Sequence, residues 1–127
     1  MDSLDARALI IEYIAAYNAF DLERMFSVLS PSVRFENYAA GKLTAQATGI
    51  AEFRTLAEQA SDVFAQRNQS VTRWQTVGDD VSVDIAYRGK LAQDVPGGPA
   101  AGTELELAGV SEFGFADGKI SRIVDRS

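Results

Sequence analysis

Hydrophobic residues recur at helical spacing in the first half of the chain and alternate with polar residues in the second half. Over residues 1–20 they recur every three or four positions, which predicts a broadly buried helix. A second, shorter helix is expected from Asp21 to Leu29, because the residue before Pro31 avoids helical dihedral angles. Gly49 is expected to introduce a third helix, whose buried face carries Phe53, Leu56, Ala57, Ala60 and Phe64.

Strand patterns dominate the rest of the sequence. Residues 33–37 alternate in a short predicted strand, and the Gly- and Ala-containing segment 38–48 is predicted to be a loop. From Val71 onward the period is two, and Val81, Val83, Ile85 and Tyr87 mark a strand that is buried on one face.

Two further strands are expected near the end of the chain. Residues 103–115 alternate, and residues 119–126 follow the tight-turn dipeptide Asp117-Gly118. Residues 95–102 hold two of the three prolines and form an exposed connection. Helices followed by strands predict an α+β fold with a mostly antiparallel sheet, in one domain over residues 1–127.

The composition narrows the chemistry that the protein can perform. The chain has 127 residues, of which 46% are hydrophobic, so it can bury a core without disulfides. It contains 0 Cys and 0 His, which excludes the usual tetrahedral zinc sites, cysteine nucleophiles and Ser-His-Asp triads. Acid–base chemistry would fall to carboxylates, Lys or Tyr.

The charge pattern bears on partners and location. Twelve Lys and Arg against 18 Asp and Glu give a net charge of -6, spread along the chain, and no clustered basic surface for nucleic acid is predicted. No window approaches the 18 or so consecutive apolar residues of a membrane span, and the first residues are acidic where a signal peptide would be basic. We therefore expect a cytoplasmic protein that binds neither nucleic acid nor membranes.

Several segments together resemble a known group of proteins. They are residues 12–22 (EYIAAYNAFDL), 35–37 (FEN), the helix opened by Gly49, 85–89 (IAYRG) and 113–120 (FGFADGKI). In this order the chain resembles the SnoaL-like polyketide cyclases and ketosteroid isomerases of the nuclear-transport-factor-two-like superfamily. The resemblance spans nearly the whole chain. It implies the cystatin-like fold, in which three N-terminal helices wrap a curved sheet into a cone with an apolar pocket. Function is less determined, because one fold serves many activities.

The isomerases provide a first template for the site. The resemblance places Tyr13 at the family's oxyanion-binding Tyr, Asn37 at its catalytic base and Ser111 at its oxyanion-binding Asp. An amide cannot accept a proton at a useful pH, so Asn37 cannot shuttle a proton between substrate carbons. Ketosteroid isomerisation by the family mechanism is therefore not expected.

The SnoaL-like cyclases, which the chain also resembles, provide a second template. This resemblance implies a base that is an acidic residue on a late strand. Asp125 is the candidate: if Ile123 points into the cone, the period of two puts Ser121 and Asp125 on the same face. Burial there would raise the pKa of Asp125 and make it a better base. The alternative is that Asp125 is solvated or salt-bridged at the chain end.

Other side chains are candidates for substrate contact or for core packing. Asp125 and Tyr13 are the predicted catalytic pair, and a separate set of residues is predicted to contact the substrate. No cofactor is required, and no metal site is expected, because Asp79-Asp80 follows Gly78 in a turn without convergent partners. The predicted substrate contacts are Asn37, Ser111, Tyr17, Phe53, Trp74, Ile85, Phe113 and Ile123.

Three functions remain open from the sequence. The first is a cofactor-independent enzyme acting on an apolar carbonyl-bearing or polycyclic molecule, and the second is a non-catalytic ligand-binding or dimeric scaffold domain. The third is an epoxide hydrolase with an Asp-Arg-Asp site, which would need Arg73 or Arg88 together with Asp84 and Asp125, although Asp84 alternates away from Val83 and Ile85. A homodimer is expected, paired through the outer face of the sheet, which carries Ala108 and Val110 between glutamates.

Overall fold

The computed structural model describes residues 3–127, which form three helices and six strands. The helices precede most of the sheet in the sequence, and the predicted α+β class is confirmed. The elements are α1 (Ser3–Asn18), α2 (Leu22–Ser27), β1 (Leu29–Ala39), β2 (Lys42–Thr48), α3 (Ile50–Val63), β3 (Phe64–Val77), β4 (Asp80–Leu91), β5 (Glu104–Ala116) and β6 (Lys119–Arg126).

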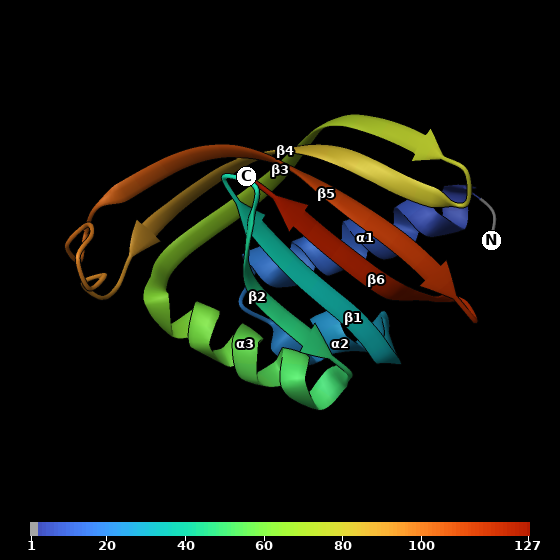
Figure 1. Ribbon diagram of the computed structural model, residues 1–127, viewed down its shortest axis with the longest axis horizontal. Coiled ribbons are helices and arrows are strands. Elements are labelled where there is room, and N and C mark those ends of the chain that lie inside the picture. Colours follow the sequence, from blue (N-terminus) through green and yellow to red (C-terminus); the bar gives the residue numbers. More distant parts are fainter. Residues whose placement is uncertain (1–2) are drawn as a thin grey trace.

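The strands form one curved sheet in the order β2-β1-β6-β5-β4-β3. β1 and β6 are parallel and every other neighbouring pair is antiparallel, which agrees with the mostly antiparallel sheet expected from the sequence. In Figure 1 the long strands β3, β4 and β5 bend into an arm, α1 runs behind β5 and β6, and α3 lies below the arm beside β1 and β2. The helices thus cover the concave face of the sheet.

The segment 38–48 is not a loop, and this part of the sequence prediction was wrong. β1 continues to Ala39, turns at Ala40 and Gly41, and returns as β2 with Ala39 opposite Lys42. Both turn residues have positive φ, 53° and 77°, as a two-residue hairpin requires. The sequence signal was weak because Ala-Gly is not one of the usual hairpin dipeptides.

The helix ends also differ from the prediction. α2 ends at Ser27, so Leu29 begins β1, and α3 ends at Val63, so Phe64 begins β3. The start of α2 is as expected, because the side chain of Asp21 accepts a hydrogen bond of 3.2 Å from the backbone N–H of Arg24. Each of the two helices ends earlier than predicted, and the residues that follow it belong to a strand.

The hydrophobic core lies between the concave face of the sheet and the helices. The largest fully buried side chains include Ile10 and Met25 from the helices and Phe113, Ile120 and Ile123 from the sheet. No helix in the described part of the chain has the length and hydrophobicity to cross a membrane.

Candidate functional site

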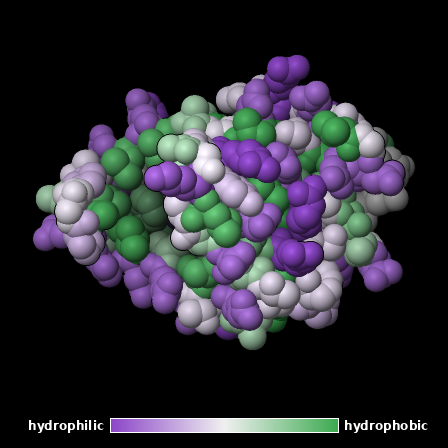
Figure 2. All heavy atoms as spheres, in the orientation of Figure 1, coloured by the Kyte–Doolittle hydropathy of each residue, from purple (hydrophilic) through white to green (hydrophobic). Residues whose placement is uncertain are grey.

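A cavity of about 470 Å³ lies under the curve of the sheet, between its concave face and the helices α1 and α3. Figure 2 shows it as a hollow lined by hydrophobic residues, between the arm of β3, β4 and β5 and the helix α3. Its volume is in the range of pockets that bind small molecules. Its hydrophobic wall includes Phe35, Phe53, Leu56, Phe64, Ile85 and Leu107.

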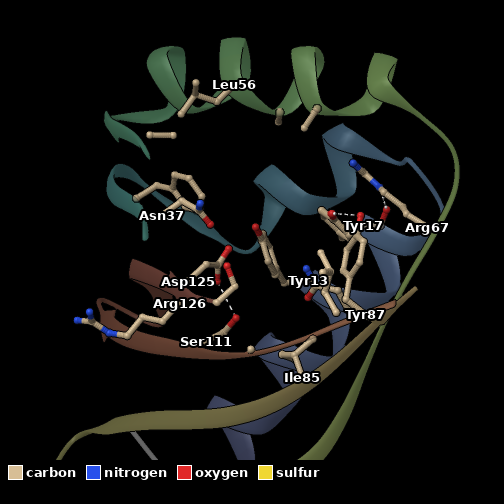
Figure 3. Close-up of a pocket in the computed structure, with 18 of the residues that line it drawn as sticks. Tyr13, Tyr17, Asn37, Leu56, Arg67, Ile85, Tyr87, Ser111, Asp125 and Arg126 are labelled. Atoms are coloured by element: carbon tan, nitrogen blue, oxygen red, sulfur yellow. Dashed lines mark hydrogen bonds between the residues drawn. The ribbon is translucent and has the colours of Figure 1, made fainter. Parts of the chain in front are cut away.

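Asp125 lies on the wall of this pocket in β6. The strand register places Asn37 of β1 and Ser111 of β5 directly beside it on the two neighbouring strands, and all three line the cavity. The Oγ of Ser111 donates a hydrogen bond of 2.6 Å to Oδ1 of Asp125 (Figure 3). Three polar side chains from three neighbouring strands therefore lie side by side on one part of the pocket wall.

The Asp125 carboxyl has a pKa shifted toward neutral pH. Burial raises its pKa from 3.8 to about 6, and the hydrogen bond from Ser111 lowers it only in part. No arginine offsets the burial: Arg122 pairs with Asp80, and Arg126 pairs with Glu112. Within residues 3–127, Asp125 has no ion pair at all. The salt-bridged chain end considered from the sequence is not what the structure shows.

Tyr13 reaches the same space from α1. Its ring is 6% exposed and packs edge-on against Phe113, with the ring centroids 6.1 Å apart. In Figure 3 the Tyr13 hydroxyl and the Asp125 carboxyl point into the same part of the pocket. Burial raises the pKa of Tyr13 well above its usual range, and the charge of Asp125 raises it further. The phenol is therefore a proton-bearing donor, and no group among the described residues accepts its hydrogen bond.

Asn37 is held by the neighbouring strand. Its side-chain N–H donates a hydrogen bond of 2.7 Å to Oγ1 of Thr44 in β2, and Thr44 in turn donates to the backbone carbonyl of Asn37. This pair orients the amide beside Asp125. Asn37 can position a ligand there, but it cannot remove a proton.

The opposite end of the pocket carries two tyrosines and an arginine. The hydroxyls of Tyr17 and Tyr87 are 3.1 Å apart, and burial raises the pKa of both phenols. Arg67 of β3 is 5% exposed, and its Nε–H donates a hydrogen bond of 2.8 Å to the backbone carbonyl of Tyr17. All three side chains line the cavity.

The structure gathers most, but not all, of the residues that the sequence singled out. Tyr13, Tyr17, Asn37, Phe53, Ile85, Ser111 and Asp125 line the cavity, whereas Trp74, Phe113 and Ile123 do not. Phe113 and Ile123 are almost completely buried in the core behind the wall. Trp74 stands farther along β3 and is covered by the guanidinium of Arg7, 4.8 Å from its ring centroid.

The Asp-Arg-Asp arrangement of the epoxide hydrolase hypothesis does not assemble. Asp84 pairs in register with Val110, whereas the neighbouring residues Val83 and Ile85 point into the core. Arg73 and Arg88 are exposed, and Arg88 pairs with Glu106. The cavity is lined by none of Arg73, Asp84 and Arg88.

Arg67 and Tyr87 are among the pocket residues that the sequence prediction missed. Tyr87 shares the alternation of Val83 and Ile85, so its side of the strand was available from the pattern. Arg67 was not predicted to face the pocket because a helix was expected up to Phe64, so the start of β3 was not recognised. Counting back by twos from Val71 through Gln69 would have brought Arg67 to the same face.

Comparison with known proteins identifies a family and a fold. The sequence model of the SnoaL-like domain matches residues 10–123, which confirms the resemblance found in the sequence. Among proteins of curated function, none matches this chain.

Solved structures share the fold over nearly the whole chain. A candidate polyketide cyclase from Xanthomonas campestris pv. campestris is 21% identical, with a TM-score of 0.85 over 98% of this chain and 90% of that chain. An NTF2-like protein from Burkholderia pseudomallei is 19% identical, with a TM-score of 0.78 over 98% and 90% of the two chains. TerC, co-crystallized with polyporic acid, is 19% identical, with a TM-score of 0.76 over 95% and 89%. At these identities the similarity establishes the fold alone.

Proposed function

This chain belongs to the SnoaL-like domain family, and from that premise we propose that it is a cofactor-independent acid–base enzyme acting on a small, largely apolar ketone. The observation that carries the proposal is the Asp125 carboxyl, which faces an apolar pocket with its pKa raised to about 6. A carboxylate with such a pKa is a useful general base at neutral pH. The description of one structural neighbour as a candidate polyketide cyclase agrees with this chemistry.

The reaction follows from the positions of two side chains. Asp125 removes a proton from the carbon beside the substrate carbonyl, and the electron pair moves onto the carbonyl oxygen as an enolate. Tyr13 donates a hydrogen bond to that oxygen, and its high pKa keeps the donor protonated. The enolate carbon then either takes the same proton back from Asp125 or attacks a second carbonyl of the same molecule to close a ring. In the second case the proton held by Asp125 passes to the new alkoxide oxygen. Asn37 and Ser111 orient the bound molecule beside the carboxyl.

The alternative is a non-catalytic domain that binds a small apolar ligand in the same pocket. It is favoured by Asn37, which stands where the ketosteroid isomerases are expected to carry their base. The co-crystallization of TerC with polyporic acid supports ligand binding in this fold under either function. The two candidates differ only in whether Asp125 moves a proton.

A proton-exchange experiment separates them. 2-Tetralone, a bicyclic apolar ketone, is incubated with the protein in D₂O, and exchange of its α protons is followed by NMR. We expect exchange above the buffer rate, rising as the pH passes about 6. Asp125→Asn should lower it by about 100-fold or more, and Tyr13→Phe by about 100-fold.

The matched control is Asp84→Asn, which removes an acid on the same sheet outside the cavity and should leave the rate unchanged. Saturable binding of 2-tetralone by the wild-type protein, without any exchange above buffer, would favour the binding domain. Equal rates for wild type and Asp125→Asn would exclude Asp125 as the base.

A further inference from the structure

Arg67 is a buried cation without an anion beside it. Its side chain is 5% exposed, and its Nη2 is enclosed without any hydrogen-bond acceptor among residues 3–127. The chain has 18 acidic residues, yet none in its described part forms an ion pair with this guanidinium. Burying an unpaired charge is costly, so an arginine in this state needs an explanation in ligand binding or in packing.

The surroundings hold the guanidinium in place without neutralising it. Its Cζ lies 3.7 Å from the ring centroid of Tyr17 and 4.4 Å from that of Phe20, and its Nε–H is bonded to the carbonyl of Tyr17. Phe20 itself has a φ of 57°, which is unusual for a bulky residue. Aromatic faces attract a cation but accept no directed hydrogen bonds from its N–H groups as a carboxylate does. The Nη2 donor is left without an acceptor on a guanidinium that is held in place.

Arg67 and Asp125 stand at opposite ends of the same pocket. Figure 3 shows Arg67 beside Tyr17 and Tyr87 at one end, and Asp125 with Ser111 at the other, with Tyr13 between them. In the register of β4, Ser111 is opposite Val83 and Arg67 is opposite Gly89, six residues further along. The charges of Arg67 and Asp125 both act on the pKa of Tyr13 and of Tyr17, whereas Arg67 has no part in the pKa of Asp125. The two charges form no ion pair with each other among the described residues, and Tyr13 lies between them.

We infer that Arg67 is the recognition site for an anionic oxygen group, a carboxylate in its simplest form, on an otherwise apolar ring compound. This inference rests on the proposed ligand pocket and specifies its substrate class as an aromatic or polycyclic acid. The carboxylate accepts hydrogen bonds from the guanidinium, and the ring system lies along the hydrophobic wall toward Tyr13 and Asp125. One end of the substrate is thus held by charge while the carbon to be deprotonated lies at the other.

A matched pair of ligands tests the inference on the intact protein. 2-Naphthoate and 2-naphthamide share a skeleton and nearly a shape, but only the naphthoate is charged at pH 7.5. Titration calorimetry should show that the wild-type protein binds naphthoate about tenfold more tightly or better, as expected for a charge-assisted hydrogen bond. The NMR signal of the Arg67 Nε–H should shift with naphthoate and move less with naphthamide.

Variants assign the preference to one side chain. Arg67→Met keeps an unbranched stem among the rings and should bring the two affinities to near parity. Arg67→Lys keeps the charge without the fork and should retain part of the preference. Arg73→Met is the matched control, because it removes the same charge from an exposed position on the same strand and should leave the preference unchanged.

The outcomes are separable from those of the catalytic proposal. Asp125→Asn should retain the preference for naphthoate even though it loses proton exchange. Equal affinity of the wild-type protein for the two ligands would overturn the inference, whatever the variants do. So would a preference that survives in Arg67→Met, or one that disappears equally in Arg73→Met.

Discussion

The Oγ of Ser111 donates a hydrogen bond of 2.6 Å to Oδ1 of Asp125 across two neighbouring antiparallel strands. This bond favours the charged form of the carboxyl, while burial favours the neutral form, and burial dominates. The balance leaves the pKa of Asp125 at about 6. Burial therefore raises the pKa of Asp125, and Ser111 keeps it lower than burial alone would.

The first prediction removes this hydrogen bond. In Ser111→Ala the pKa of Asp125 should rise above about 6, because only the group that lowers it is lost. A pH titration of the carboxyl carbon by NMR measures the change. Ser82→Ala is the control, since Ser82 is opposite Glu112 while the neighbouring Val83 is opposite Ser111. An unchanged or lower pKa in Ser111→Ala would show that the hydrogen bond does not control this carboxyl.

The second prediction concerns stability against pH. The pKa of Asp125 is higher in the folded protein than the usual 3.8, so the folded state binds this proton more tightly than the unfolded chain does. The tighter binding of this proton by the folded state favours folding below about pH 4, and this stabilisation is lost as the pH rises through about 6. Ionised Asp125 should therefore cost roughly 2–3 kcal/mol at pH 8.

Asp125→Asn makes that cost measurable. The variant should be more stable than the wild type at pH 8 and equally stable near pH 4, as followed by thermal unfolding of both proteins across the range. A stability difference that stays constant with pH, or that grows toward acid, would contradict the raised pKa.

The alternation of residues made much of the sheet predictable. The strand 81–88 and the Asp117-Gly118 turn are where the pattern placed them, because hydrophobic positions there repeat strictly by two. The same periodicity put Asp125 on the face of Ile123 and Ser111 on the face of Phe113. The structure has both polar residues on the pocket wall and both apolar residues in the core behind it.

The wall opposite Asp125 could not be predicted in the same way. β3 has irregular register between Phe64 and Gln66 and again between Val71 and Arg73, and each irregularity breaks the count of two. The irregularity between Val71 and Arg73 lies between the pocket and Trp74, which the sequence had assigned to the pocket. Arg67 lies on a regular stretch and was missed because the strand was expected only from Val71 onward. A buried arginine also contradicts the usual expectation that charged residues are exposed, so its burial was only evident once the helices were placed.

The third prediction is a homodimer formed through the outer face of the sheet. Ala86 and Ala108 are opposite each other on β4 and β5, and both are exposed between the charged pairs Arg88–Glu106 and Arg126–Glu112. A small apolar area with a charged rim suits a modest interface. Light scattering should give twice the chain mass of 13.7 kDa.

A charge in the middle of that face should separate the two copies. Ala86→Asp is expected to shift the protein toward the monomer, while Ala51→Asp, at an exposed position of α3, should leave the mass unchanged. A wild-type mass near 13.7 kDa at micromolar concentration would show that this face is free.

The fourth prediction is that the wild-type protein does not isomerise a 5-ene-3-ketosteroid, because Asn37 stands where the isomerases are expected to carry the base that moves the proton between substrate carbons. Asn37→Asp together with Ser111→Asp should introduce the activity. Asn37→Asp supplies the missing carboxylate on β1. Ser111→Asp places a second carboxyl directly beside Asp125. Because two adjacent carboxylates cannot both ionise easily, one of them keeps a proton and can donate a hydrogen bond to the enolate oxygen together with Tyr13.

The conjugated ketone is followed by its ultraviolet absorbance, and Ser111→Asp alone serves as the control that lacks a base on β1. Turnover by the wild type would mean that Asp125 already performs this reaction, and an inactive double variant that still binds the steroid would mean that Asn37 is too far from the substrate carbon to act.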